Sequence, residues 1–151
     1  MADGAREWSL SYLASHSTLT LATESNGVPF ACSLFFANAE FTLYFVSDPK
    51  TRHAENIKLN PRVAVTIHGQ GDDWRSLQGL QIEGDCEEII EETEVREARR
   101  VYAGKFPFVS EIGAMANVRF YRIRPSRVRL IDNTRGFGFK EEFVPNEEKQ
   151  E

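Results

Sequence analysis

The stretch that most constrains the fold runs from Leu43 to Pro61, because its pattern changes from strand to helix within a few residues. Up to Ser47, β-branched and aromatic residues alternate between two faces, which is typical of a β-strand. Asp48 is a good helix N-cap, and Pro49 suits the first helical position because its missing N–H would have no partner there. Asn60-Pro61 ends the helix, since proline cannot continue it.

Basic side chains gather in the first turn of this helix, where the macrodipole is already positive. Lys50, Arg52 and His53 lie there together with the hydroxyl of Thr51. Cations, a hydroxyl and free backbone N–H groups at a helix start suit a phosphate group. Two interpretations follow from the residues alone: a phosphate site, or a solvated turn in which Asp48 is a plain cap.

The composition is that of one soluble domain. The chain has 151 residues, of which 41% are hydrophobic and 27% charged, and its formal net charge is −5. This length supports a core, and the negative charge argues against a nucleic-acid-binding surface. No apolar run approaches the roughly 20 residues of a membrane span, and the N-terminus lacks the pattern of a secretory signal. We expect a cytoplasmic protein with one domain over residues 1–151, ending in a charged tail at about 141–151.

Alternating apolar and polar residues predict six β-strands. They are expected over Ser17 to Thr23, Val28 to Phe36, Phe41 to Ser47, Arg62 to His68, Gln78 to Ile89 and Val118 to Ile131. Asn26-Gly27 is a two-residue turn signal, so the first three strands are expected to form a meander. Short helices are predicted over Arg6 to Ala14, Glu91 to Tyr102 and Phe106 to Met115. These elements predict a mainly β (α+β) fold, an antiparallel barrel with small peripheral helices, with a two-sheet sandwich as the alternative.

Five arginines gather in the last predicted strand, namely Arg119, Arg122, Arg124, Arg127 and Arg129. Pro125 interrupts this strand, which indicates a bulge or an edge position. The favoured interpretation is an edge strand whose charge prevents pairing with other chains. The alternative is a basic wall that faces an anionic ligand or a partner subunit.

The sequence contains no recognisable catalytic motif. Its three histidines lack metal-ligand spacing, and there is no GxSxG, Walker or Rossmann fingerprint. The glutamates and arginines of residues 91–100 are typical of a solvated helix face. Cys32 and Cys86 lie far apart, in phase with apolar strand positions, so both are expected to be reduced, unpaired and buried. We therefore name no catalytic residue and no metal ligand.

The order of several short motifs resembles that of the FMN-binding split β-barrels related to pyridoxamine 5'-phosphate oxidase. The motifs are Tyr44 to His53 with the following Asn60-Pro61, Leu80 to Gly84, and Tyr121 to Val128. Ile131 to Gly138 resembles the tail of the small YhbP-like branch. The resemblance covers about residues 10 to 140. It implies a six-stranded antiparallel split β-barrel that forms a homodimer, with each FMN in the cleft between the two subunits.

The resemblance also implies a set of cofactor-binding residues. Thr51, Arg52 and His53 take the places of the family's Ser-Arg-Lys at the FMN phosphate, in agreement with the anion argument above. Gln78 is near a family glutamine, although the preceding loop differs in length. The strand that ends at the cofactor contributes Val46 and Ser47, and the strand beside the isoalloxazine ring contributes Ala31, Cys32, Ser33 and Leu34.

Three departures from the family's pattern bear on activity. The oxidase has an arginine and a lysine on its second strand, where this chain has Ala31 and Phe36. Its C-terminal substrate-binding pattern of arginine and histidine is not visible, so oxidation of pyridoxamine 5'-phosphate itself is not expected. His53 replaces a lysine and would be mostly neutral at pH 7 with a typical pKa of about 6.5. We therefore expect FMN binding that is weaker than in the oxidase or dependent on pH.

The function favoured by this resemblance is that of an FMN-dependent oxidoreductase acting on a small molecule, with an electron donor such as NAD(P)H. In such a site the flavin carries the redox chemistry, and the protein supplies binding and orientation. One alternative is a non-catalytic binder of flavin, haem or deazaflavin that serves storage or sensing. Another is an interaction protein with a vestigial cleft. No nucleic-acid or membrane partner is expected.

Overall fold

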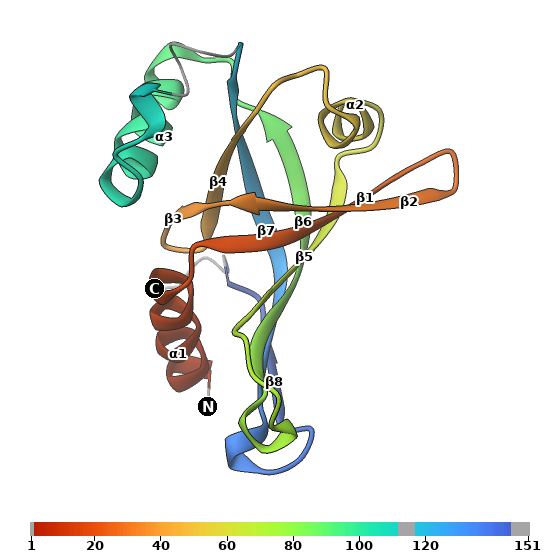
Figure 1. The fold of residues 1–151 in the computed structure, drawn as a ribbon, viewed down its shortest axis with the longest axis vertical. Helices are drawn as coiled ribbons and strands as arrows, with labels where there is room; N and C mark the ends of the chain where they lie inside the picture. The colour runs from red at the N-terminus through yellow and green to blue at the C-terminus, as the bar shows by residue number, and fades with distance from the viewer. Residues whose placement is uncertain (1, 112–116, 146–151) are drawn as a thin grey trace, which may run out of the picture.

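The computed structural model describes residues 2–111 and 117–145 of the chain. Eight strands, three helices and two short 3₁₀ turns follow one another within this part, besides the helical residues 109–111 (Figure 1). In chain order they are α1 (Ala2–Ser15), β1 (Thr18–Ser25), β2 (Val28–Phe35), β3 (Ala37–Ala39), β4 (Thr42–Ser47), α2 (Arg52–Leu59), β5 (Arg62–His68), η1 (Trp74–Ser76), β6 (Gln78–Glu88), α3 (Glu92–Lys105), β7 (Arg119–Asp132), η2 (Asn133–Arg135) and β8 (Lys140–Phe143).

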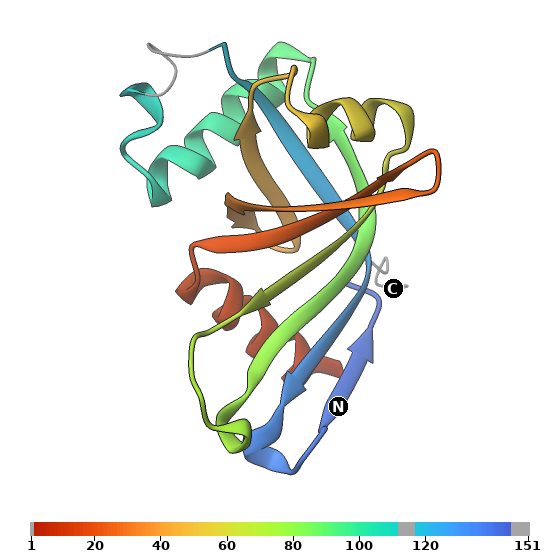
Figure 2. The same ribbon diagram turned by 45° about the vertical axis from the view of Figure 1, so that its right-hand side comes forward.

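All eight strands belong to one antiparallel sheet, in the order β2-β1-β5-β6-β7-β4-β3, with β8 also paired to β7. The two ends of this order, β2 and β3, are separated in the chain only by Phe36. The sheet therefore curls until its ends meet, as Figure 2 shows. Phe36 is fully buried at this junction. The mainly β, split-barrel architecture predicted from the sequence is confirmed.

The interior of the barrel is filled by the side chains that point inward from each strand. α2 covers part of this interior, because Ala54 and Ile57 belong to the same buried cluster as Leu21 and Phe45. A second buried cluster lies under α3, where Tyr102 packs against β4 and β7 residues. Cys32 is half-buried and Cys86 is buried, and both are free thiols as predicted. Among the described residues, no helix is long and apolar enough to cross a membrane.

α2 begins later than predicted. Its N-cap is Thr51, whose side-chain oxygen accepts a hydrogen bond from the Ala54 N–H at 3.3 Å, so Asp48 and Pro49 lie before the helix. Asp48 stabilises the preceding turn instead, because its Oδ1 accepts from the Lys50 N–H at 2.8 Å. A threonine is a good N-cap, because its side-chain oxygen can accept a hydrogen bond from a backbone N–H of the first turn.

The predicted meander is wrong at its third strand. β1 and β2 form the expected hairpin, but β4 pairs with β3 and β7 and not with β2. The strands β3 and β8 were not predicted, because neither is long enough to show an alternating pattern. β8 lies within the predicted charged tail, and residues 146–151 lie outside the described part. In the predicted helix from Phe106 to Met115, residues 109–111 are helical and residues 112–116 are not described.

The interpretation of the arginine-rich strand as a sheet edge is also wrong. β7 pairs with β6 along one side and with β4 and β8 along the other. The bulge expected at Pro125 is confirmed, because the β6–β7 register shifts there and Pro125 faces Gly84. A Cβ atom on Gly84 would lie 2.5 Å from the Arg124 carbonyl oxygen, so the close approach requires glycine.

The arginines of β7 find carboxylates from distant parts of the chain. Glu87 accepts from both Arg122 and Arg124, and Glu94 of α3 also accepts from Arg122. Arg122 thereby ties α3 to the sheet. A charged central strand is tolerated here because the neighbouring strands supply the opposite charges.

Candidate functional site

The turn between β4 and α2 is closed by its own hydrogen bonds. The Thr51 N–H donates to the Asp48 carbonyl oxygen at 3.1 Å, and the Thr51 hydroxyl donates to the same oxygen at 2.9 Å. The hydroxyl oxygen also accepts from the Ala54 N–H as the helix cap. The proton of Thr51 is therefore already in use, and a phosphate in this turn would find it as an acceptor and not as a donor.

His53 is buried in this structure and is therefore not one of the exposed basic side chains of the turn. Its side chain is 8% exposed, and its Nε2 lies 2.6 Å from the Ser47 hydroxyl and 3.3 Å from that of Thr51. Burial lowers the pKa of His53 below its usual value. The imidazole is therefore neutral at pH 7 and adds no positive charge to the turn.

The exposed cations of the turn are Lys50 and Arg52. The guanidinium carbon of Arg52 lies 4.5 Å from the centre of the Phe30 ring on β2. Phe30 was not among the predicted site residues, and its place opposite Arg52 could not be found from sequence spacing. The first backbone N–H groups of α2 have no carbonyl acceptor within the helix, and apart from the Ala54 N–H, which Thr51 caps, they are of the kind that binds an anion at a helix start.

Two hydrogen bonds hold the β1–β2 hairpin beside α2. The Asn56 side chain donates to the Thr23 hydroxyl at 3.0 Å, and that of Asn60 donates to Glu24 at 2.7 Å. Thr23 pairs across the hairpin with Phe30, which places β2 next to the first turn of α2. The predicted residues of β2 thus lie close to the predicted phosphate turn, although they come from separate parts of the sequence.

The four predicted residues of β2 divide between two faces. Cys32 and Leu34 are half-buried on the face that carries Phe30, and Ala31 and Ser33 are exposed on the opposite, outer face. Burial raises the pKa of the Cys32 thiol, so this cysteine is protonated at neutral pH. β2 is an end strand of the sheet order, so a flat ligand at its free edge could contact both sets.

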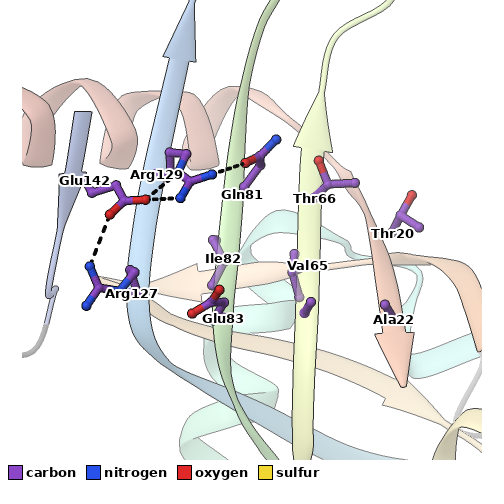
Figure 3. Close-up of a pocket in the computed structure, with 11 residues that line it drawn as sticks. Thr20, Ala22, Val65, Thr66, Gln81, Ile82, Glu83, Arg127, Arg129 and Glu142 are labelled. Carbon is purple, nitrogen blue, oxygen red and sulfur yellow. Dashed lines mark hydrogen bonds and ion pairs between the residues drawn. The ribbon is translucent and has the colours of Figure 1, made fainter. Parts of the chain in front are cut away.

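The outer face of the sheet carries a shallow hollow of about 290 Å³ (Figure 3). Two rows of cross-strand partners lead from Ser33 and Ala31 on β2 to the side chains that line the hollow. One row runs through Ser33, Thr20, Thr66, Gln81, Arg129 and Glu142, and the other through Ala31, Ala22, Ala64, Glu83 and Arg127. The small side chains of β1 and β5 leave the floor of the hollow flat.

Two arginines line the hollow, and a carboxylate of the same chain partly neutralises their positive charge. Arg127 donates to Glu142 at 3.1 Å, Arg129 donates to the other oxygen of the same carboxylate, and Arg129 also donates to Gln81 at 3.3 Å (Figure 3). The hydrogen bond from Arg129 is the largest cause of the lowered pKa of Glu142. Two guanidinium groups thus share the Glu142 carboxylate, and Glu83 adds a second negative charge, so the charged side chains that line the hollow balance one another.

Val46 and Gln78 are the remaining predicted residues. Val46 is half-buried and packs on the cluster beneath α3. Gln78 starts β6, and its side chain donates to Asp132 at 3.1 Å near η2. The other end of β6 lies beside α2, because the Cys86 N–H donates to the Pro61 carbonyl oxygen at 2.8 Å. Within one chain, therefore, Gln78 and the α2 turn are at opposite ends of a long strand.

Comparison with known proteins decides the family. The sequence pattern of the pyridoxamine 5'-phosphate oxidase family matches residues 9–132. The chain belongs to this family. It is 30% identical over 131 residues to the UPF0306 protein plu4501 of Photorhabdus laumondii, covering 85% of this chain and 88% of that protein. It is 29% identical over 132 residues to the UPF0306 protein YhbP of Escherichia coli O157:H7, covering 85% and 86%. The predicted likeness to the YhbP-like branch is confirmed.

Solved structures of other proteins share the fold. A heme binding protein from Mycobacterium smegmatis superposes with a TM-score of 0.80 at 19% identity, covering 93% of this chain and 58% of that one. A FAD-binding protein from Mesorhizobium loti superposes with a TM-score of 0.68 at 23% identity, covering 81% and 88%. At these identities the likeness establishes architecture. This architecture accommodates haem in the first of these proteins and FAD in the second.

Proposed function

We propose that this chain binds FMN beside β2 and the first turn of α2, and that it acts as a flavin-dependent oxidoreductase on a small molecule. The observation that carries the proposal is the exposed Arg52 at a helix start, directly opposite the ring of Phe30 on the strand beside it. A helix start with an adjacent arginine suits a phosphate, and an aromatic strand edge suits a flat ring. Membership of the pyridoxamine 5'-phosphate oxidase family supports the same choice of cofactor.

Different residues would hold the phosphate and the ring of FMN. Arg52 and the backbone N–H groups of the first turn of α2 would hold the phosphate, and Lys50 would add a second, more mobile charge. Phe30, Cys32 and Leu34 would lie along the flavin. When bound, the flavin supplies the redox chemistry, with an electron donor such as NAD(P)H. The chain's own residues bind and orient it, and we assign none of them as an acid or base.

A non-catalytic binder of flavin or haem is the second candidate function. It is supported by the heme binding protein of M. smegmatis, whose fold this chain shares along 93% of its length. The neutral, hydrogen-bonded state of His53 and the protonated thiol of Cys32 also leave the site without an evident proton donor of matched pKa. Such a protein would hold its cofactor without turning over an electron donor.

A homodimer is part of the proposal. The outward face of β2 is exposed in the single chain, where Phe35 has 49% of its surface accessible. This face continues into the flat, small-residue floor of the outer hollow. A second copy packed on this face would cover it, and in a two-fold dimer the same patch of each subunit forms the interface.

The test of the proposed cofactor site is Arg52→Ala with FMN and riboflavin as ligands. A hydrogen bond to a charged group contributes about 1.5–3 kcal/mol, so FMN affinity should fall on the order of 10- to 100-fold. Riboflavin lacks the phosphate, so its weaker binding should not fall. Arg100→Ala is the matched control, because Arg100 is an exposed arginine of α3 that pairs with Glu97 and should leave both ligands unaffected.

The same titrations separate the functions. Flavin fluorescence that is quenched equally by the parent and Arg52→Ala would show that the turn is only solvated. Oxidation of NAD(P)H that requires both protein and FMN would support the oxidoreductase, and binding without turnover would favour the storage or sensing protein. Hemin binding that exceeds FMN binding would move the choice of cofactor to haem.

A further inference from the structure

One ring nitrogen joins the two ends of the turn that presents Arg52. The Nε2 atom of His53 lies 2.6 Å from the hydroxyl of Ser47, the last residue of β4. It also lies 3.3 Å from the hydroxyl of Thr51, the N-cap of α2. The intervening residues are tied on the outside by Asp48, as described above, so His53 is the inner tie of the same turn.

The contacts around the ring are those of a buried structural group. Ser47 and His53 are 7% and 8% exposed, and the imidazole packs 6.2 Å from the ring of Phe45 in the main core. A short hydrogen bond between two buried side chains is held more firmly than one in water, because no solvent competes for it. The ring therefore faces the interior, on the other side of the backbone from the exposed Arg52.

We propose that His53 is a positioning residue for the cofactor phosphate: it ties the end of β4 to the cap of α2 from the buried side and thereby fixes the turn that presents Arg52. His53 itself does not contact the phosphate. This inference rests on the proposed FMN site. It differs from the role that the sequence position implies, where His53 would replace a lysine as a direct phosphate ligand.

The mechanism is preorganisation. Arg52 follows the cap residue directly, so its backbone N–H and the start of its side chain are placed by the conformation of Thr51. With the turn tied on both sides, the donors of the first helical turn converge before the ligand arrives, and less ordering is needed on binding. If the inner tie is lost, Thr51 keeps its bond to Asp48 but the turn can shift relative to β4, and Arg52 shifts with it.

A double-mutant cycle on Ser47 and His53 tests this role. Ser47→Ala and His53→Ala each remove one side of the same tie, so each should lower FMN affinity by about 3- to 10-fold. The double variant should be no weaker than the weaker single variant, because the tie can be lost only once. Riboflavin affinity should stay within twofold throughout, since the effect acts through the phosphate. His53→Gln places an uncharged polar atom near the position of Nε2 and should restore most of the FMN affinity.

The outcomes separate this inference from the proposed function. If His53 binds the phosphate directly, Ser47→Ala will leave FMN affinity unchanged and His53→Ala will have the same effect in both Ser47 backgrounds, which overturns the positioning role alone. If the parent chain binds no FMN, both the site and the positioning role are overturned. Ser47→Ala removes a single oxygen atom, so the decisive variant does not depend on tolerance of a cavity at His53.

Discussion

Asp132 offers a quantitative test of how the end of the barrel opposite α2 is held. This aspartate is 3% exposed, and its Oδ1 accepts from the Thr134 N–H at 3.0 Å, the Thr134 hydroxyl at 2.6 Å and the Gln78 side chain at 3.1 Å. Its Oδ2 lies 3.3 Å from Arg135. Burial alone would raise the pKa of Asp132, but the bonds from Thr134 and Gln78 and the charge of Arg135 lower it overall.

The substitution Asp132→Asn keeps the shape and removes the charge. Hydrogen bonds to a charged group contribute about 1.5–3 kcal/mol and neutral ones about 0.5–1.5 kcal/mol, so each of the three bonds loses about 1 kcal/mol. The bonds share one oxygen and are not independent, and the pair with the half-exposed Arg135 adds little. We expect the free energy of unfolding to fall by about 2 kcal/mol, which lowers the Tm by about 4–8 °C for a chain of this length.

Urea and thermal unfolding followed by circular dichroism measure this change. The pKa of Asp132 is lowered in the folded state, so its contribution is present above its unfolded value of about 3.9 and is lost as the pH falls below that. The difference between parent and variant should therefore be full at pH 7 and shrink toward pH 3. Asp72→Asn, in the exposed loop before η1, should change stability by less than about 0.5 kcal/mol. A difference that is small at pH 7, or equally large at pH 3, would refute this account.

Two further predictions concern the interface and the buried histidine. The parent should sediment at twice the mass of one 17.2 kDa chain, and Ala64→Arg on the outer face should give the single-chain mass; a parent that is monomeric at micromolar concentration would contradict the dimer. The pKa of His53 is lowered by burial, so its contribution to stability is complete above its unfolded value of about 6.5 and declines as the pH falls below it. The parent should therefore lose stability relative to His53→Gln between pH 7.5 and pH 5, and parallel unfolding curves would refute this.

Local patterns in the sequence predict most of the sheet. Strands β1, β2, β5 and β6 follow from alternation, because one face of each strand is more buried than the other and the period of two is visible in the residues. β7 was also found, but its place in the sheet was misjudged. Its arginines are typical of an edge, and only the fold brings Glu87, Glu94 and Glu142 close enough to neutralise them. Such pairing joins residues far apart in sequence, so composition alone cannot reveal it.

The candidate site shows the same limit at closer range. The position of Arg52 at a helix start could be predicted, since caps and charges of a first turn are local features. The inward direction of His53 could not, because it depends on where Ser47 ends β4 and on how Phe45 fills the core. Phe30 was missed for a similar reason: its ring meets Arg52 only after the hairpin has folded against α2.

The contact between Arg52 and Phe30 also determines how the site should respond to a ligand. An exposed cation over an aromatic ring gains about 0.5–1 kcal/mol, and a charge-assisted bond to a phosphate gains about 1.5–3 kcal/mol. The phosphate therefore wins the competition for the guanidinium, and Arg52 is free to leave the ring when FMN arrives. Its departure would uncover the face of Phe30 at the moment when a flat ring needs a surface to lie on. With His53 neutral and buried, this exchange rests on Arg52, so a cofactor without a phosphate would leave the guanidinium on Phe30 and meet a covered ring.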